Sequence, residues 1–145
     1  MDRDYDALLL ANQLCFPLYA ASKEVVRRYA PYLAALDLTY TQYLAMLVLW
    51  EHRAISAKAM GDLLFLDSGT LTPVLKSLET KGYVKRSRSA RDERILLCEV
   101  TDIGLALREK ALDVPRQVAS CVCLTPEEGR TLYALLYKVL GNTTK

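Results

Sequence analysis

The sequence has 145 residues, of which 52% are hydrophobic and 25% are charged, and its formal net charge is +2 at pH 7. This composition is that of a globular chain and excludes intrinsic disorder, and the length fits a single domain over residues 1–145. No apolar run reaches the roughly 18 residues of a membrane span, and the first residues lack the pattern of a signal peptide, so we expect a cytoplasmic protein.

The first predicted element is a helix. From Tyr5 to Arg28, apolar residues recur at intervals of three and four, which is the period of one helix face. Pro17 lies inside this run and should bend the helix near Gln13 to Cys15, because proline removes a backbone donor. Pro31 should end or interrupt the helix, and residues 32–36 would then add a short turn.

Two further helices are predicted before the most basic part of the chain. Thr39 or Thr41 can cap the first, which is apolar nearly all round and should therefore be buried at the centre of the fold. Ser56 can cap the second, a short helix over residues 57–65. Its predicted inward-facing residues are Met60, Leu63 and Leu64.

A winged helix-turn-helix is predicted next. Residues 68–81 form a helix that opens on small hydroxyl residues and ends at Gly82, and two strand-like runs, 83–86 and 95–100, enclose a charged loop. Between Lys76 and Arg94 seven Lys and Arg residues face three Asp and Glu residues, a local balance of +4 in a chain of only +2. Such a helix can lie in a DNA major groove while the hairpin reaches the flanking phosphates.

The predicted DNA contacts come from both parts of this unit. On the helix they are Ser68, Thr70, Thr72 and Lys76, and on the hairpin they are Arg86, Arg88, Arg91, Asp92 and Arg94. The alternative is that these arginines belong to an ordinary solvated turn without a role in DNA binding. Arg94 can also pair with Asp92 and hold the shape of the hairpin.

The C-terminal part predicts two more helical stretches. Thr101 and Asp102 cap a helix through about Leu112, and Pro115 should bend or break its continuation. A capping box at residues 125–128 opens the last helix. The residues that this helix should bury are Leu132, Leu135, Leu136 and Leu140.

The expected fold is therefore mainly α, with a winged helix-turn-helix at about residues 39–100. The helices at about residues 5–36 and 102–141 are too apolar to stand alone beside so small a core, and we expect them to form a dimerisation region. In a homodimer, two recognition helices about 34 Å apart would read a palindrome in successive major grooves.

Several motifs resemble a known family. Asp92-Glu93-Arg94, followed by Val100-Thr101-Asp102-Ile103-Gly104, resembles the wing signature of MarR-type repressors. Four other stretches resemble the organic-hydroperoxide-sensing branch of that family, the OhrR proteins: Asn12–Phe16, Leu38–Leu44, Leu49–Glu51 and Leu66–Pro73. The resemblance covers about residues 8–114 and is looser beyond them.

This resemblance implies a homodimeric repressor that binds palindromic double-stranded operator DNA when reduced. It implies that Cys15 is the sensor, that organic hydroperoxides are the inducers, and that Tyr19, Tyr29 and Tyr40 lie near the thiol. The chemistry of these residues agrees, because the thiolate is the reactive form, hydroxyl donors stabilise it, and aromatic rings make an apolar pocket. Where relatives often carry a basic residue, this chain has Ser77.

Oxidation of the sensor gives a sulfenic acid, which needs a second thiol to trap it reversibly. Cys121 and Cys123 precede the last helix, so the chain resembles the two-cysteine type, which forms a disulfide between subunits. We favour Cys121 as the partner of Cys15, with Cys123 as the alternative. A Cys121–Cys123 bond is disfavoured by disulfide geometry.

Competing interpretations exist for the thiols and for the function. Cys15 taken alone could be an inert core residue, and Cys98, in a predicted strand, is expected to be structural. One histidine and no CxxC motif leave a metal site without ligands, and no cofactor is expected. The alternative functions are a MarR-type repressor released by a phenolic ligand without redox chemistry, and a thiol peroxidase that uses Cys15, in which the basic unit would serve no purpose.

Overall fold

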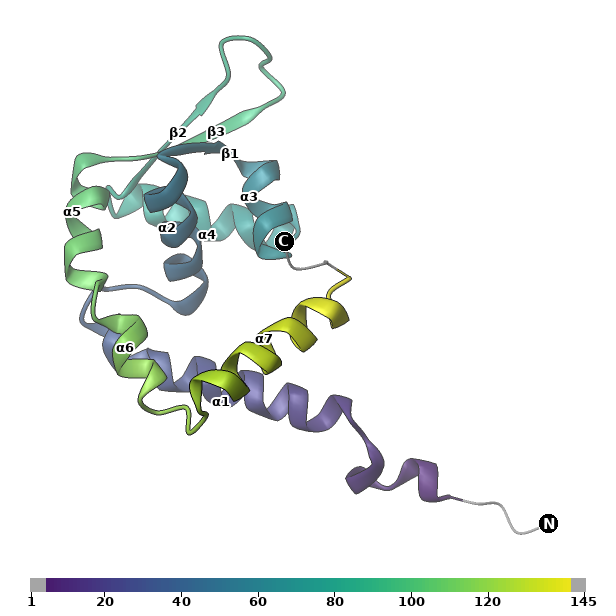
Figure 1. Ribbon diagram of the computed structural model, residues 1–145. Coiled ribbons are helices and arrows are strands. Elements are labelled where there is room, and N and C mark those ends of the chain that lie inside the picture. Colours follow the sequence, from purple (N-terminus) through teal and green to yellow (C-terminus); the bar gives the residue numbers. More distant parts are fainter. Residues whose placement is uncertain (1–4, 142–145) are drawn as a thin grey trace. The chain divides into compact units, whose positions relative to one another are not determined.

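The computed structural model describes residues 5–141, and the chain divides into two compact units at the boundary between Val114 and Pro115. Figure 1 shows that the chain is mostly helical with one small sheet. Among the described residues, no helix is both long enough and apolar enough to cross a bilayer.

The N-terminal segment differs from its prediction. Two short 3-10 turns, η1 (Asp6–Leu8) and η2 (Leu10–Asn12), precede helix α1 (Cys15–Ala34). The predicted helix is thus wrong before Cys15, and Pro17 lies in the first turn of α1 instead of bending a longer helix. Proline is tolerated there because the first N–H groups of a helix have no intrahelical acceptor. Pro31, which was predicted to end or interrupt the helix, lies inside α1.

Helix α2 (Tyr40–His52) is the central helix, as predicted. Thr39 and Gln42 form a capping box, in which the Thr39 hydroxyl accepts a hydrogen bond from the Gln42 N–H and the Gln42 side chain accepts one from the Thr39 N–H. The buried residues of α2 are Gln42, Tyr43, Ala45, Met46, Val48, Leu49 and Trp50. The indole N–H of Trp50 donates to the carbonyl of Gly104 at 2.8 Å, and this bond connects α2 to a later helix.

Helices α3 (Ala57–Leu64) and α4 (Ser68–Thr80) form the helix-turn-helix. Ser56 caps α3 as predicted, and Met60 is buried, but Leu63 is 52% exposed, so its predicted inward orientation is wrong because it lies on the solvent face of α3. Asp67 caps α4 by accepting a hydrogen bond from the Thr70 N–H at 2.8 Å.

The wing is a β-hairpin of β2 (Val84–Arg88) and β3 (Leu96–Val100), which Figure 1 shows extending away from the helices. Gly82, at a φ of +80°, follows α4 and turns the chain into β2, in agreement with the prediction that it ends the helix. A third strand, β1 (Ala54–Ser56), pairs with the other edge of β3 and was not predicted. Three residues are too few to display an alternating pattern.

Helix α5 (Asp102–Ala111) begins at the base of the wing. The hydroxyl of Thr101 caps it by accepting a hydrogen bond from the Gly104 N–H at 3.1 Å, as predicted. A Cβ at Gly104 would lie 2.3 Å from the carbonyl oxygen of Tyr83, so glycine is required where the helix crosses the chain that leads into β2. This close approach is the physical reason for glycine in the Thr101–Gly104 motif.

Helices α6 (Val114–Ala119) and α7 (Pro126–Val139) complete the chain. The helix breaks as predicted, but just before Pro115: α5 ends at Ala111 and α6 begins at Val114, so Pro115 lies in the first turn of α6. The capping box of Thr125 and Glu128 is also confirmed. The predicted burial of Leu132, Leu135, Leu136 and Leu140 is wrong for the single chain: α7 has no buried residue, and Leu132, Leu135 and Leu140 are 45%, 55% and 50% exposed.

Candidate nucleic-acid interface and thiol site

The recognition helix α4 presents a polar face opposite an apolar one. Ser68, Thr72 and Lys76 follow one another at intervals of four, so they lie along one side of the helix. Ser68 and Lys76 are exposed, as is Thr70 in the first turn, and Thr72 is half-buried. The opposite face holds α4 against the rest of the unit through buried leucines: Leu71, Leu75 and Leu78. This placement leaves the predicted DNA-contacting side chains of α4 accessible.

The tip of the wing carries a charged pair. The Arg94 guanidinium donates to both carboxylate oxygens of Asp92, at 3.0 and 3.1 Å, and the Arg94 N–H donates to the same carboxylate at 3.0 Å. These bonds hold the pKa of the Asp92 carboxyl below its usual range. The structure thus confirms that the two residues pair, while the Arg94 side chain remains 90% exposed. Arg88 and Arg91 are also exposed on the wing.

Arg86 differs from the other wing arginines. Its guanidinium lies against the carboxylate of Glu79, with Nε 2.9 Å and Nη2 2.8 Å from Oε2, and its backbone N–H donates to Oε1 at 3.1 Å. These hydrogen bonds lower the pKa of Glu79. The side chain of Arg86 is only 19% exposed, so it fastens β2 to α4. Its charge is already paired with Glu79 in the absence of DNA, and contact between Arg86 and DNA stays a prediction.

The sequence did not reveal a polar cluster behind α4. The side chain of Gln42 donates to the Ser77 hydroxyl at 2.9 Å, and the Lys81 ammonium donates to Gln42 Oε1 at 3.2 Å. The same ammonium forms an ion pair with Asp37 at 3.3 Å. Ser77 therefore faces α2. A glutamine within a helix that is apolar nearly all round was the available signal.

Cys15 is the first residue of α1, and its side chain is exposed. Tyr19 lies one turn later on the same face and is 61% exposed, with the Lys23 ammonium 5.0 Å from the centre of its ring. Leu14 and Phe16, on either side of Cys15, are also exposed. The thiol thus lies at an accessible helix start among apolar side chains.

A second group of tyrosines lies where the end of α1 meets α2. The ring centres of Tyr29 and Tyr40 are 4.9 Å apart, and Tyr43, which was not among the predicted site residues, lies 5.7 Å from Tyr29. Burial raises the pKa of each of these phenols, so they remain protonated donors at neutral pH. An apolar hollow of about 180 Å³ adjoins Tyr40, between α1 and the start of α2.

Cys15 and Tyr29 are fourteen residues apart on the continuous helix α1, which places them about 21 Å apart along its axis. The structure therefore brings Tyr29 and Tyr40 together and keeps them away from the Cys15 of their own chain. Of the three predicted pocket tyrosines, only Tyr19 lies within one turn of that thiol.

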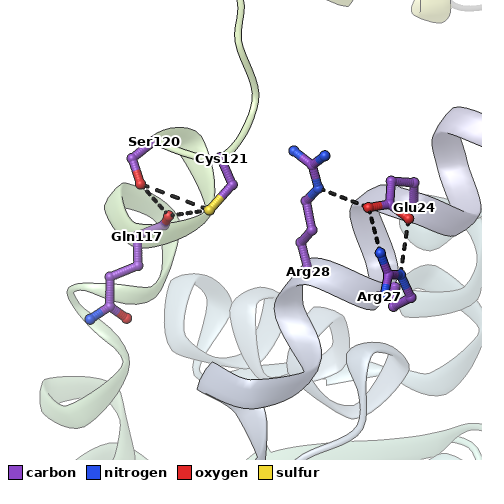
Figure 2. Close-up of polar contacts among 6 residues, drawn as sticks. All are labelled: Glu24, Arg27, Arg28, Gln117, Ser120 and Cys121. Carbon is purple, nitrogen blue, oxygen red and sulfur yellow. Dashed lines mark hydrogen bonds and ion pairs between the residues drawn. The ribbon is translucent and has the colours of Figure 1, made fainter.

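Between these two groups, α1 carries an ion cluster. Figure 2 shows Arg27 and Arg28 donating to the carboxylate of Glu24, with Arg27 at 2.9 Å through two nitrogens and Arg28 at 3.1 Å. The hydrogen bonds from Arg27 and then Arg28 lower the pKa of Glu24 to about 2. Pairs at these spacings stabilise the middle of the helix that separates the thiol from Tyr29.

The other cysteines occupy contrasting surroundings. Figure 2 shows Cys121 after α6, where its Sγ lies 3.5 Å from the carbonyl oxygen of Gln117, to which the Ser120 hydroxyl also donates. Cys121 is half-buried and Cys123 is exposed. Cys98 is fully buried in β3, and this burial raises the pKa of its thiol to about 11. Cys98 is thus a core residue, in line with its predicted structural role.

Comparison with known proteins gives consistent matches over most of the chain. The family model for the transcriptional regulators SarA/Rot matches residues 27–110. The organic hydroperoxide resistance transcriptional regulator of Bacillus subtilis (strain 168) is 46% identical over 140 residues, which are 97% of this chain and 95% of the relative.

Solved structures agree with these matches. Reduced AbfR bound to DNA is 39% identical, with a TM-score of 0.75 and 91% of each chain covered. Disulfide-formed AbfR is also 39% identical, with a TM-score of 0.65 and coverage of 90% of this chain and 92% of that one. AbfR is a protein of Staphylococcus epidermidis.

Proposed function

We propose a specific sensing mechanism for this chain, which belongs to the organic-hydroperoxide-resistance branch of the MarR-type winged-helix transcriptional regulators. Its fold and its relatives are those of redox-sensing, DNA-binding repressors and not of enzymes. In our proposal the reduced protein binds a palindromic operator through α4 and the wing, and oxidation of Cys15 by an organic hydroperoxide releases it.

The observation that carries this proposal is the exposure of Cys15 at the first turn of α1, among exposed apolar side chains. An apolar surface around an accessible thiol suits a hydroperoxide that has an apolar tail. The positive end of the helix dipole also lies where the thiolate charge develops. Cys98, by contrast, is shielded from any oxidant by complete burial.

The complete sensor requires two chains in this proposal. Tyr29 and Tyr40 are protonated donors, but about 21 Å of helix separates Tyr29 from the Cys15 of its own chain. The tyrosines that stabilise a given thiolate therefore belong to the second subunit. Exposed apolar residues on the N-terminal segment and on α7 supply the surface that a second copy would cover: Leu8, Leu9, Leu10 and Leu14, and Leu132, Leu135, Val139 and Leu140.

The chemistry proceeds in two steps. The Cys15 thiolate attacks the terminal peroxide oxygen of the hydroperoxide, the O–O bond breaks, and the leaving alkoxide takes up a proton as an alcohol, which leaves a sulfenic acid on Cys15. The thiol of Cys121 from the second subunit then attacks the sulfenic sulfur, which forms an intersubunit disulfide and releases water. Cys123 is the alternative resolving thiol.

Operator binding before and after oxidation tests this function. We expect the reduced protein to bind DNA with a strongly salt-dependent affinity, because phosphate contacts release counterions. Cumene hydroperoxide should abolish binding of the native protein and leave binding by Cys15→Ser intact. If Cys15→Ser still dissociates on treatment, Cys15 is not the sensor. If the untreated native protein is instead released by a phenolic ligand, and peroxide has no effect, the redox mechanism is wrong.

A further inference from the structure

We propose that the hydrogen bond from the buried Gln42 to Ser77 couples the tyrosine cluster at the α1–α2 junction to the recognition helix α4. Gln42 is then a positioning residue that transmits the redox state of the sensor to the DNA-reading surface. This inference rests on the proposed redox function, and it assigns to particular residues the link between sensing and DNA release.

The side chain of Gln42 is buried in the core. It is 6% exposed, and among residues 5–141 it is the sole polar or charged side chain in the buried class. Burying an amide is unfavourable unless its hydrogen bonds are made inside the protein. Any movement that pulls its partners away therefore leaves a buried polar group unsatisfied, and such a group favours a small number of discrete arrangements over gradual sliding.

Three bonds make Gln42 a junction between two helices. Its Oε1 accepts from the Thr39 N–H at 3.0 Å, which caps the start of α2, and from the Lys81 ammonium at 3.2 Å, immediately after α4. Its Nε2 donates to the Ser77 hydroxyl at 2.9 Å, in the last turn of α4. One side chain thus fixes the first turn of α2 against the C-terminal end of the recognition helix.

The same turn of α2 carries Tyr40, one of the two tyrosines of the proposed sensor, and Tyr43, which packs against Tyr29. Tyr40 begins the helix and Tyr43 follows Gln42 directly, and their rings lie 4.9 and 5.7 Å from that of Tyr29. If Tyr29 and Tyr40 lose their hydrogen bonds to the partner's thiolate on oxidation, this turn is free to shift. Gln42 must then carry α4 with it or break its bond to Ser77.

Apolar packing cannot transmit such a shift equally well. The remaining inward face of α4 is made of Leu71, Leu75 and Leu78, whose burial stabilises the helix but is non-directional. The bond between Gln42 and Ser77 is directional and specific to one relative placement of α2 and α4. It is also particular to a chain with a small hydroxyl residue at position 77.

The test separates coupling from folding and from DNA contact. Gln42→Met keeps the length of the side chain and removes all three hydrogen bonds, whereas Gln42→Glu keeps an acceptor for Thr39 and Lys81 and can accept from the Ser77 hydroxyl. For each variant we would measure the rate of Cys15 thiol loss with cumene hydroperoxide, and the operator Kd of the reduced and the oxidised dimer.

We expect Gln42→Met to lose its thiol at the native rate while the ratio of oxidised to reduced Kd falls by about tenfold, a typical size for a coupling between sites. Gln42→Glu should restore most of the ratio. Ser77→Ala should also lower the ratio of oxidised to reduced Kd. If Gln42→Met does not fold, Ser77→Ala alone tests the coupling. The matched control is Lys76→Ala, which removes an exposed charge one position away and should weaken both states equally.

A preserved ratio in Gln42→Met or in folded Ser77→Ala, with both dissociation constants changed by the same factor, overturns the inference and leaves Gln42 with a purely structural role. Failure of the proposed function has a different signature, because the native protein would then show the same Kd before and after peroxide treatment.

Discussion

Cys15 and Tyr29 lie on one uninterrupted helix, fourteen residues apart, and this separation of about 21 Å prevents either residue from touching the other within a chain. A sensor built from both must therefore use Cys15 of one subunit and Tyr29 and Tyr40 of the other. The ion cluster of Glu24 with Arg27 and Arg28 lies on the stretch of α1 between them and favours a helical, extended spacer.

Mixed dimers test this arrangement. One chain carries Cys15→Ser, and the other carries Tyr29→Phe with Tyr40→Phe, and differently tagged chains allow the heterodimer to be purified. The remaining thiol then faces intact tyrosines of its partner, so we expect it to react with hydroperoxide at about the native rate. The homodimer in which both chains carry Tyr29→Phe and Tyr40→Phe should react at least about tenfold more slowly, because a hydrogen bond to a charged group contributes roughly 1.5–3 kcal/mol. An equally slow heterodimer would place the functional tyrosines in the same chain as the thiol.

The resolving thiol is tested by single substitutions on a non-reducing gel. We expect peroxide to convert the native protein to a crosslinked dimer, and Cys121→Ser to remove that band while Cys123→Ser and Cys98→Ala retain it. Cys98→Ala is the matched control, since a fully buried thiol should not take part. Retention of the band in Cys121→Ser together with its loss in Cys123→Ser would reverse our choice of partner.

The wing arginines should fall into two functional groups. Arg94 is oriented by Asp92 but 90% exposed, and we expect Arg94→Ala to weaken operator binding about tenfold or more. Arg91→Ala should lower the slope of log affinity against log salt by about one, if Arg91 contacts a phosphate.

Arg86 provides the contrast, because its charge is paired with Glu79. We expect Arg86→Ala and Glu79→Gln each to lower the free energy of unfolding. Both should change operator affinity less than Arg94→Ala does. Urea denaturation alongside operator titration measures both quantities. An affinity loss in Arg86→Ala as large as in Arg94→Ala, at unchanged stability, would instead support the prediction that Arg86 contacts DNA.

The buried thiol of Cys98 should make the free energy of unfolding depend on pH. Its folded pKa of about 11 lies above the ordinary value of 9.0 because burial disfavours the thiolate. The unfolded chain therefore loses this proton first, and stability is complete below about pH 9 and falls as the pH rises towards 11. By pH 10.5 the loss should reach about 2 kcal/mol.

Cys98→Ala removes this thiol, although it also leaves a small cavity. The informative quantity is therefore the difference in free energy of unfolding between pH 8 and pH 10.5, measured for both proteins by urea denaturation. We expect that difference to be smaller in Cys98→Ala, while the raised tyrosine pKa values contribute equally to both proteins. Equal differences would mean that Cys98 does not titrate as its burial requires.

Local signals in the sequence were sufficient for most elements of the DNA-reading unit. Ser56 and Thr101 cap the helices they were predicted to cap, Gly82 follows α4, and the hairpin lies where two β-rich runs enclose a charged loop. Each of these features depends on a few neighbouring residues, through a cap, a φ above zero or strand alternation. The start of α1 was misjudged because its apolar spacing continues through η1 and η2, although these residues form only short turns.

The sequence by itself determined the family, the order of the helices and the candidate thiols, because these depend on residue identities and on short-range periodicity. The tertiary structure decided which side chains meet. It paired Arg86 with Glu79, turned Ser77 towards Gln42, gathered Tyr43 with Tyr29 and Tyr40, and kept Tyr29 away from Cys15 of the same chain. These relationships depend on how separate helices and strands pack against one another, whereas a local sequence pattern describes only residues within one element.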